Sequence, residues 1–409
     1  MAQSGSVHAW GAWGRRFKSC HSDYFIKFIY MKNIQILIFL ILSINISCAQ
    51  LGETYIRDDE TINIPETINY EIKNIYSDVE IPWSIEFLNN ETIIYAEKRG
   101  EIFIIKDGKS IKVENVPEIY LRGQGGLLDL ELHPNFANNN LIYISYALGS
   151  REDGGGNTAV SRAKLIQNKL TDLELLYKGE GNSTRGQHFG TRLQFDNDGK
   201  LFFAIGDRGN RDELPQNLSL DGGKIYRIND DGTIPDDNPF VNDENTIKAI
   251  YSYGHRNPQG IFLHPKTGKI WTNEHGPKGG DEINIISKGK NYGWPKITYG
   301  INYSGTTITD EKEHPEMEQP LYYWIPSIAP SGFAYVSSNK YKKWKGSLLT
   351  GSLKFKYLER LVLNKNNKVV YREKIADSIG RVRDVKESPD GFIYFTVENK
   401  GIFKIVPKE

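Results

Sequence analysis

The chain has 409 residues and a mass of 46.6 kDa, and its 51 basic and 51 acidic residues give a formal net charge of zero. This balance gives no reason to expect nucleic acid or an anionic membrane surface as a partner. Aromatic residues make up 12% of the chain and glycine occurs 39 times, which is typical of many short strands joined by tight turns. We therefore expect one large β domain.

The amino-terminal part resembles a targeting segment. Met31 and Lys32 precede an apolar run over residues 34–46, and small residues follow up to Ala49. This order is typical of a signal peptide that is cleaved after Ala49, with export to the periplasm or the medium. We expect the chain to have four parts: a non-native upstream extension at 1–30, the signal peptide at 31–49, an N-terminal segment with the ring-closing strand (the lead-in) at 50–77, and the propeller domain at 78–409.

The two cysteines of the chain are Cys20 and Cys48. Both precede the predicted cleavage point, so the folded part is expected to contain no disulfide. Lipidation of Cys48 is the alternative to cleavage after Ala49, and it would attach the protein to a membrane.

One pattern recurs along the rest of the chain, in which a turn rich in Asn, Asp, Gly or Pro precedes two strands joined by a short charged link. Its six copies begin at Leu88, His133, Phe195, His264, Ser331 and Glu387. A period of about 40 to 60 residues is that of four-stranded propeller blades. The pattern predicts an all-β, six-bladed β-propeller of antiparallel blades.

The ring of blades needs to be closed, because an open sheet edge is a liability. The extended segment from Ile68 to Ile75 is predicted to pair with the last blade and to close it. Insertions at 149–157 and 299–320 are expected to be long loops, and few helices are expected.

The densest cluster of turn residues and charges lies between Tyr251 and Pro295. It contains a Gly-His-Arg-Asn-Pro run over 254–258 and a Glu-His-Gly-Pro-Lys-Gly-Gly-Asp-Glu run over 274–282. Here the backbone turns sharply, so that its carbonyls can face a ligand. Connecting turns with solvated charges are the alternative reading.

A histidine that could act as a base lies in the Gln-His-Phe-Gly run over 187–190. Histidine is the side chain best suited to accept a proton near neutral pH. His188 could equally be a hydrogen-bonding loop residue. Further along, Asp207 in Gly-Asp-Arg-Gly could orient a neighbouring group or only cap its turn.

Four cations lie at the ends of different predicted blades: Arg256, Lys354, Arg381 and Arg383. Arg381 and Arg383 are two residues apart, so they share one face of a strand, and Lys354 is placed in an otherwise apolar strand. If these cations converge on the propeller axis, they form a pocket for a polyanion. Solvated rim charges are the alternative.

Taken in order, the segments GQGG, HFGTRL, IGDRG, GHRNPQG, EHGPKGGDEIN, NYGWP, SLK and RVRD resemble those of the soluble pyrroloquinoline quinone (PQQ)-dependent glucose/sorbosone dehydrogenases. The chain looks most like the aldose sugar dehydrogenases of that family, over about residues 78–406. The resemblance implies oxidation of an aldose to its lactone, with hydride passing to PQQ and an external acceptor then taking the electrons.

The resemblance also assigns roles to individual residues. His188 matches the catalytic base, and Arg256 matches the arginine beside the reacting quinone oxygens. The positions that match contacts to PQQ, which has three carboxylates, are Gln124, Arg208, Arg256, Asn257, Lys354, Arg381 and Arg383.

Metal positions follow from the same resemblance. Gly276 and Pro277 match residues whose backbone carbonyls hold the Ca²⁺ that also binds PQQ. Glu282 and Tyr292 match a second, structural Ca²⁺ site. Calcium prefers oxygen ligands, including carbonyls, and polarises a quinone carbonyl as a Lewis acid.

Two positions depart from the glucose-specific members of the family. Gln187 stands where those members have an aspartate before the base, so the group that orients His188 must differ or Gln187 must substitute for it. Arg208 stands where they have a glutamine, which favours a broader range of aldoses.

Two other functions fit the fold. A Ca²⁺-dependent propeller hydrolase of the lactonase type would use acidic and amide ligands around a central metal, without converging cations. A non-catalytic propeller that binds sugar or protein would tolerate replacement of His188. The sequence leaves open whether the chain is a monomer or a homodimer.

Overall fold

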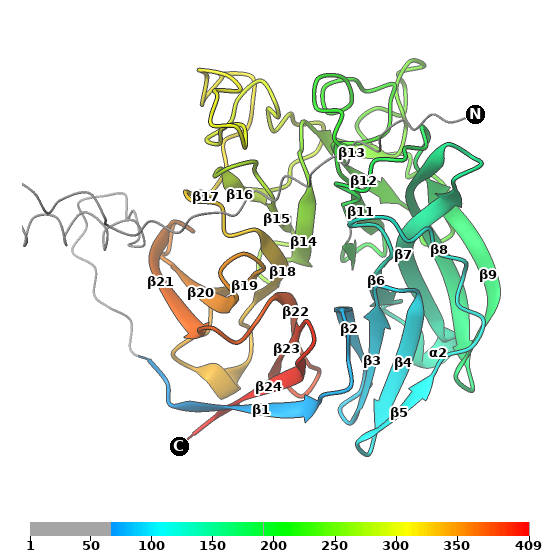
Figure 1. Cartoon of the computed structure of the whole chain (residues 1–409), viewed down its shortest axis with the longest axis vertical. Helices are drawn as coiled ribbons and strands as arrows, with labels where there is room; N and C mark the ends of the chain where they lie inside the picture. The colour runs from blue at the N-terminus through cyan, green and yellow to red at the C-terminus, as the bar shows by residue number, and fades with distance from the viewer. Residues whose placement is uncertain (1–66, 191, 409) are drawn as a thin grey trace, which may run out of the picture. The chain divides into compact units, whose positions relative to one another are not determined.

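The computed structural model describes residues 67–190 and 192–408, and within them the chain is almost entirely β-structure (Figure 1). The predicted upstream extension, the signal peptide, both cysteines and most of the lead-in lie outside the described residues. No helix in the described ranges is both long enough and apolar enough to span a bilayer.

The strands form six four-stranded antiparallel sheets, which confirms the predicted six-bladed propeller. The first three blades, each given from its inner to its outer strand, are β2 (Pro82–Asn89), β3 (Thr92–Glu97), β4 (Glu101–Lys106) and β5 (Lys109–Lys112); β6 (Leu127–Leu132), β7 (Leu141–Ser150), β8 (Gly155–Ile166) and β9 (Lys169–Lys178); and β10 (Leu193–Phe195), β11 (Leu201–Ile205), β12 (Lys224–Ile228) and β13 (Ile250–Tyr253). The other three are β14 (Pro258–Leu263), β15 (Ile270–Glu274), β16 (Asp281–Ile285) and β17 (Tyr322–Trp324); β18 (Pro330–Tyr335), β19 (Leu348–Ser352), β20 (Tyr357–Leu363) and β21 (Val369–Ala376); and β22 (Val382–Glu387), β23 (Ile393–Val397), β24 (Gly401–Pro407) and β1 (Tyr70–Tyr76).

The inner strands make the ring continuous. Contacts run from β2 to β6, β10, β14, β18 and β22 in turn, and β22 contacts β2. Apolar side chains fill the spaces between consecutive blades; for example, Trp344 and Leu358 of the fifth blade pack with Phe395 of the sixth. Tyr394 of the sixth blade packs with Ile85 and Tyr95 of the first across the point of closure. Burial between blades is therefore what holds the ring together.

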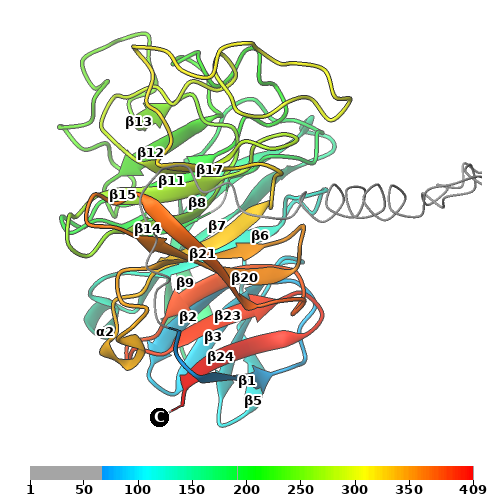
Figure 2. The same cartoon turned by 90° about the vertical axis from the view of Figure 1, so that its left-hand side faces the viewer.

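The segment predicted to close the ring forms β1, which pairs antiparallel with β24 from Tyr70 opposite Pro407 to Tyr76 opposite Ile402. Figure 2 shows these two strands side by side, the first in blue and the last in red. The Tyr70 hydroxyl donates to the carbonyl of Ile375 at 2.5 Å, which ties β1 to the fifth blade as well.

The connections agree with the predictions in part. The segment 299–320 belongs to the long loop that joins β16 to β17, as expected, and Figure 1 shows it in yellow. The segment 149–157 was predicted to be a loop, and this is wrong: it is the end of a long hairpin in which Gly149 pairs with Gly156 and Leu148 with Asn157. Helices are few within residues 67–190 and 192–408, as expected: α2 (Phe136–Asn139) and the 3-10 helix η2 (Asn339–Tyr341).

Candidate active site

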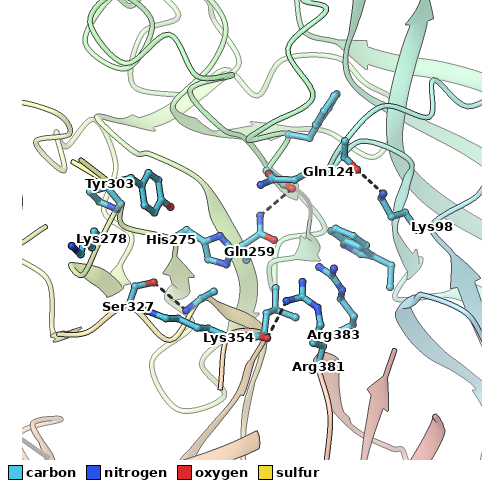
Figure 3. Close-up of a pocket in the computed structure, with 17 residues that line it drawn as sticks. Lys98, Gln124, Gln259, His275, Lys278, Tyr303, Ser327, Lys354, Arg381 and Arg383 are labelled. Carbon is cyan, nitrogen blue, oxygen red and sulfur yellow. Dashed lines mark hydrogen bonds between the residues drawn. The ribbon is translucent and has the colours of Figure 1, made fainter. Parts of the chain in front are cut away.

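A cavity of about 890 Å³ lies where loops and strand ends from all six blades meet (Figure 3). Its wall contains Trp83, Lys98, Gly123, Gln124, Phe189, Gly190, Gln259, His275, Pro277, Lys278, Tyr303, Ser327, Ala329, Leu353, Lys354, Arg381 and Arg383. Five of the predicted site residues are in this wall, namely Gln124, Pro277, Lys354, Arg381 and Arg383. The structure therefore brings together residues that are far apart in the sequence.

The wall of the cavity is cationic. It contains Lys98, Lys278, Lys354, Arg381 and Arg383, and it contains no aspartate or glutamate. Positive groups that outnumber the acidic groups around one partly buried space favour an anionic ligand with several charges.

Arg381 and Arg383 share one carboxylate. They were predicted to lie on one face of a strand, but β22 begins at Val382, so Arg381 precedes the strand and only Arg383 is within it. Arg381 Nε donates to Glu398 Oε2 at 2.8 Å, and Arg383 pairs with the other oxygen of Glu398. Arg383 also lies 4.2 Å over the ring of Trp83. Burial lowers the pKa of Arg383 to about 10, so it remains charged at neutral pH. This arrangement fixes both guanidinium groups at the cavity wall, which Figure 3 shows.

Lys354 lies elsewhere than predicted. Strand β19 ends at Ser352, so Lys354 is in the exposed turn beyond the strand, and its Nζ lies 5.1 Å from the ring centre of Phe355. The turn lets the lysine reach the cavity without burying its charge in a sheet.

His188 is held by a buried carboxylate. Its Nδ1 lies 2.5 Å from Asp207 Oδ1, and its backbone N–H donates to Gln124 Oε1 at 2.8 Å. The other oxygen of Asp207 accepts from Trp294 Nε1 at 2.8 Å, and Oδ1 also accepts from the backbone N–H of Gly209 at 2.8 Å. Asp207 thus both orients a neighbour and caps its turn. Asp207 is therefore the group that orients His188, which the sequence left open because Gln187 precedes the histidine.

The electrostatics of this pair leave the histidine neutral. Burial lowers the pKa of His188 below its ordinary value, and the nearby Arg256 and Arg208 act in the same direction. The hydrogen bond from His188 lowers the pKa of Asp207, so the aspartate is ionised and accepts the proton on Nδ1. Nε2 then carries the free lone pair and has no hydrogen-bond partner among the described residues.

His188 itself is not in the cavity wall, although its neighbours Phe189 and Gly190 are. Its side chain is 11% exposed, and its backbone adopts a left-handed conformation with φ of 55°. Such a conformation is strained for a residue with a Cβ, and strain of this kind gathers at functional sites.

Arg256 and Asn257 lie behind the wall as well. Arg256 donates to the carbonyls of His275 and Gly276 at 3.0 and 2.8 Å, and Asn257 Oδ1 accepts from the backbone N–H of Gly190 at 3.1 Å. The Nδ2 of Asn257 is buried and has no hydrogen-bond partner in the described part of the chain. A buried donor without a partner is costly, and it fits a place where a ligand supplies the acceptor.

Arg208 supports the loop that carries His188. Its guanidinium lies 3.4 Å from the ring centre of Phe189 and donates to the carbonyls of Gly156, Arg185 and Gln187. Burial lowers its pKa to about 10. The structure does not place Arg208 in the cavity wall, so its visible contacts are with the loop that carries His188.

The two residues predicted to hold Ca²⁺ beside the cofactor are adjacent to the cavity. Pro277 is in the wall, and Gly276 precedes it in a turn so tight that a Cβ would lie 2.2 Å from the carbonyl oxygen of Gly280. Only glycine fits there, and the next residue along the chain is in the cavity wall. That carbonyl already accepts one hydrogen bond from Arg256, and it has a second lone pair.

The other predicted metal pair lies away from the cavity. Glu282 accepts from Asn284 Nδ2 at 3.1 Å, and the same amide donates to Glu274 Oε1 at 2.9 Å. Burial beside Glu274 raises the pKa of Glu282 to about 8. The Tyr292 hydroxyl is engaged with the backbone of Ile285, so only its carbonyl could be a ligand. No contact between Glu282 and Tyr292 is seen.

Several wall residues were missed by the sequence analysis. Lys98 donates to the carbonyl of Gly123 at 2.6 Å, and His275 shares a hydrogen bond with the carbonyl of Pro330 at 2.7 Å. Burial next to Arg256 lowers the pKa of His275 to about 3, so it is neutral. His275 and Gln259 were within runs of interest but were given no role, while Lys98 and Trp83 gave no signal beyond ordinary turn and strand residues.

Comparison with known proteins gives consistent results. Residues 79–404 match the family model described as Glucose / Sorbosone dehydrogenase. The Escherichia coli K12 protein named Aldose sugar dehydrogenase YliI is 40% identical over 354 residues, which cover 84% of this chain and 94% of that protein. Quinoprotein glucose dehydrogenase B of Acinetobacter calcoaceticus is 31% identical over 416 residues, covering 80% of this chain and 85% of that protein. The apo-form crystal structure of the soluble aldose sugar dehydrogenase from Escherichia coli matches with a TM-score of 0.78 and 37% identity, covering 83% of this chain and 100% of the other.

Proposed function

The chain belongs to the glucose/sorbosone dehydrogenase family, and on that premise we propose that it oxidises aldose sugars at the anomeric carbon to aldonolactones, with PQQ as cofactor and Ca²⁺ as metal. The observation that carries the proposal is the Asp207–His188 pair. It leaves His188 Nε2 unprotonated, on a residue that directly precedes two residues of the cationic cavity wall. A base and a site for a polyanion are what this reaction requires.

The cavity residues fit PQQ. Its three carboxylates match a wall with five cations and no acidic residue, and Arg381 and Arg383 are already fixed by Glu398. The orphaned Nδ2 of Asn257 and the amide of Gln124 are suited to its polar edge. When bound, the quinone supplies the acceptor for the two electrons removed from the sugar.

The described residues contain no group of three or more His, Cys, Asp or Glu side chains that could hold a metal. The proposed calcium ligands are the backbone carbonyls of Gly276 and Pro277, a ligand type that Ca²⁺ accepts. A carbonyl site completed by cofactor oxygens suits a hard cation. At the second site, Glu282 and Glu274 accept from the same amide of Asn284, so their carboxylates lie close together, which suits a cation at that point. Both assignments are part of the proposal.

The residues of the chain then have defined tasks. His188 Nε2 takes the proton from the anomeric hydroxyl, and the ionised Asp207 stabilises the imidazolium that results. Arg256 is held behind the cavity wall by the carbonyls of His275 and Gly276. Its positive charge stabilises the negative charge that develops in the cavity during the reaction. Phe189, backed by Arg208, keeps the histidine loop in place.

A lactonase-type hydrolase is less well supported by the same geometry. Such an enzyme would need acidic side chains around a central metal, and the cavity wall contains none. The wall instead holds cations that a hydrolase of that type has no use for.

The proposal is tested by titrating the purified apo-protein with PQQ and Ca²⁺ and following the quinone absorption before and after adding aldoses. We expect tight, Ca²⁺-dependent binding and bleaching to the reduced form. His188→Ala should keep PQQ and lose dye-linked oxidation by a factor of about 10² or more. His133→Ala is the matched control and should retain activity, because His133 packs against Tyr143 and Phe195 and pairs with Asp230, away from Asp207 and the cavity wall. Absence of PQQ binding, or turnover retained without His188, would remove the proposed mechanism.

A further inference from the structure

The mouth of the cavity carries an unusual concentration of exposed apolar side chains. Nine large hydrophobic residues are exposed in the described part of the chain, and five of them belong to segments of the cavity wall. These five, which we call the apolar collar, are Leu121, Ile301, Tyr303, Ile325 and Phe355, with exposures of 56%, 37%, 73%, 61% and 42%.

Each collar residue is tied to the wall. Tyr303 is itself in the wall, Phe355 follows Lys354, and Leu121 and Ile325 each lie two residues before a wall residue. Ile301 forms an isolated β-bridge with Lys278. A separation of two residues spans about 7 Å at most, so the collar lies around the opening.

The charged residues in these segments are all basic. The stretches 121–124, 277–280, 301–307, 325–329 and 353–356 contain no acidic residue and four cations, which are Arg122, Lys278, Lys354 and Lys356. All four are exposed. The chain as a whole has 51 charges of each sign, so these segments are more basic than the chain average.

A sugar does not explain the collar. Leucine and isoleucine offer no hydrogen bond to sugar hydroxyls, and a ligand inside the cavity would leave Leu121 and Ile325 in water. Exposed apolar patches bordered by charge are instead typical of transient protein interfaces. The absence of acidic residues in these segments makes an acidic surface the complementary one.

We propose that the apolar collar docks a small acidic electron-carrier protein, which accepts electrons one at a time. This inference rests on the proposed function, because that reaction leaves two electrons in the site. Oxidation of one aldose to its lactone releases two electrons and two protons. Two carrier molecules take one electron each in successive encounters, and the two protons pass to water. Each carrier must leave before the next arrives, which suits a small interface of less than about 1,200 Å².

The test uses the PQQ- and Ca²⁺-loaded enzyme with two protein acceptors that share a fold and size: cytochrome c, which is basic, and succinylated cytochrome c, which is acidic. A phenazine-linked dye is the small acceptor. We expect the acidic form to be reduced at least about tenfold faster than the basic form at low salt, and its rate to fall as salt is added.

The variants separate docking from chemistry. Leu121→Ser combined with Ile325→Ser should lower kcat/KM for the acidic cytochrome by about tenfold and leave the dye rate unchanged. Arg122→Glu with Lys356→Glu should do the same and weaken the salt dependence. Leu175→Ser is the matched control, since Leu175 is 51% exposed on β9 outside the cavity wall, and it should change neither rate.

Other outcomes overturn the inference. Equal reduction of both cytochromes, or dye turnover with no reduction of either, would show that the mouth does not select an acidic protein. Collar variants that change the oligomeric state but not the cytochrome rate would show a surface for a second copy of this chain. If the unmodified enzyme with PQQ and aldose does not reduce even the dye, the proposed function has failed rather than the docking site.

Discussion

Replacing Asp207 by asparagine removes the negative charge beside His188 and keeps the shape of the side chain. In the native structure the carboxylate accepts from His188 Nδ1, from Trp294 Nε1 and from the backbone N–H of Gly209. An asparagine has one accepting oxygen and one donating NH₂ group. It cannot serve the histidine on one side and the tryptophan on the other.

The size of the effect follows from that mismatch. If the oxygen stays with His188, the NH₂ group meets the Trp294 donor, and a buried donor left unpaired costs about 1–3 kcal/mol of stability. If the NH₂ group faces His188, Nδ1 must accept, so the proton moves to Nε2 and the base is lost. General-base catalysis contributes about 10²–10⁴-fold, so we expect kcat to fall within that range at neutral pH.

The pH dependence gives a second readout. The base must be neutral, so kcat/KM falls as pH drops through the His188 pKa in the free enzyme. Asp207 raises that pKa against the lowering effect of burial. Removing its charge lowers the pKa further, and the acid limb of the residual activity should move to lower pH.

The assay is dye-linked aldose oxidation by PQQ-loaded enzyme across pH, with folding checked by circular dichroism. Asp221→Asn is the matched control, because Asp221 is equally buried and accepts from the Tyr177 hydroxyl and from the backbone N–H of Glu180. It should lose stability without changing kcat or the acid limb. An Asp207→Asn enzyme that binds PQQ and keeps kcat within about twofold would refute the assignment of this pair.

Three further predictions concern binding and stability. Arg381→Ala should weaken PQQ binding by about tenfold, at the low end for a charge-assisted hydrogen bond because the side chain is 41% exposed; an absorption titration that gives unchanged affinity would contradict the carboxylate pocket. Exhaustive chelation should abolish PQQ-dependent turnover, and added Ca²⁺ should restore it better than Mg²⁺, which demands tighter octahedral geometry; full activity after chelation would contradict the metal assignment. Trp344→Ala should lower the free energy of unfolding by about 3–5 kcal/mol in a denaturant titration, because the ring is fully buried and packs against Tyr341 and against Tyr70 of β1. A loss below about 1 kcal/mol would show that the neighbouring side chains fill the space left by the ring.

The fold could be predicted because each blade repeats one local pattern of turn, strand, link and strand. The segment 149–157 was wrongly predicted to be a loop, because consecutive glycines such as Gly154, Gly155 and Gly156 are typical of loops. Glycine tolerates the positive φ of 76° at Gly154 and 108° at Gly155, and here it lets two long strands pair to the end of their hairpin. The register of that pairing depends on neighbours across the hairpin, which a linear pattern does not reveal.

The candidate site could be predicted where charge stood out against its surroundings, as in Arg381 and Arg383. Lys98 and His275 were missed because a lysine in a turn and a histidine in a charged run are ordinary locally. Their importance comes from the ring, which brings the first, fourth and sixth blades to one cavity. Asp207 was seen as an orienting or a capping residue, and only the three-dimensional contact shows that it is both.

The pairing of β1 with β24 also sets the order of events during synthesis. The sixth blade takes one strand from the beginning of the described chain and three from its end. It therefore cannot be completed until the carboxyl-terminal residues have left the ribosome. Arg381 and Arg383 reach Lys98 and Trp83 only at that moment, so a nascent or truncated chain has no assembled cavity. Cofactor loading is consequently a property of the finished polypeptide, and it follows synthesis.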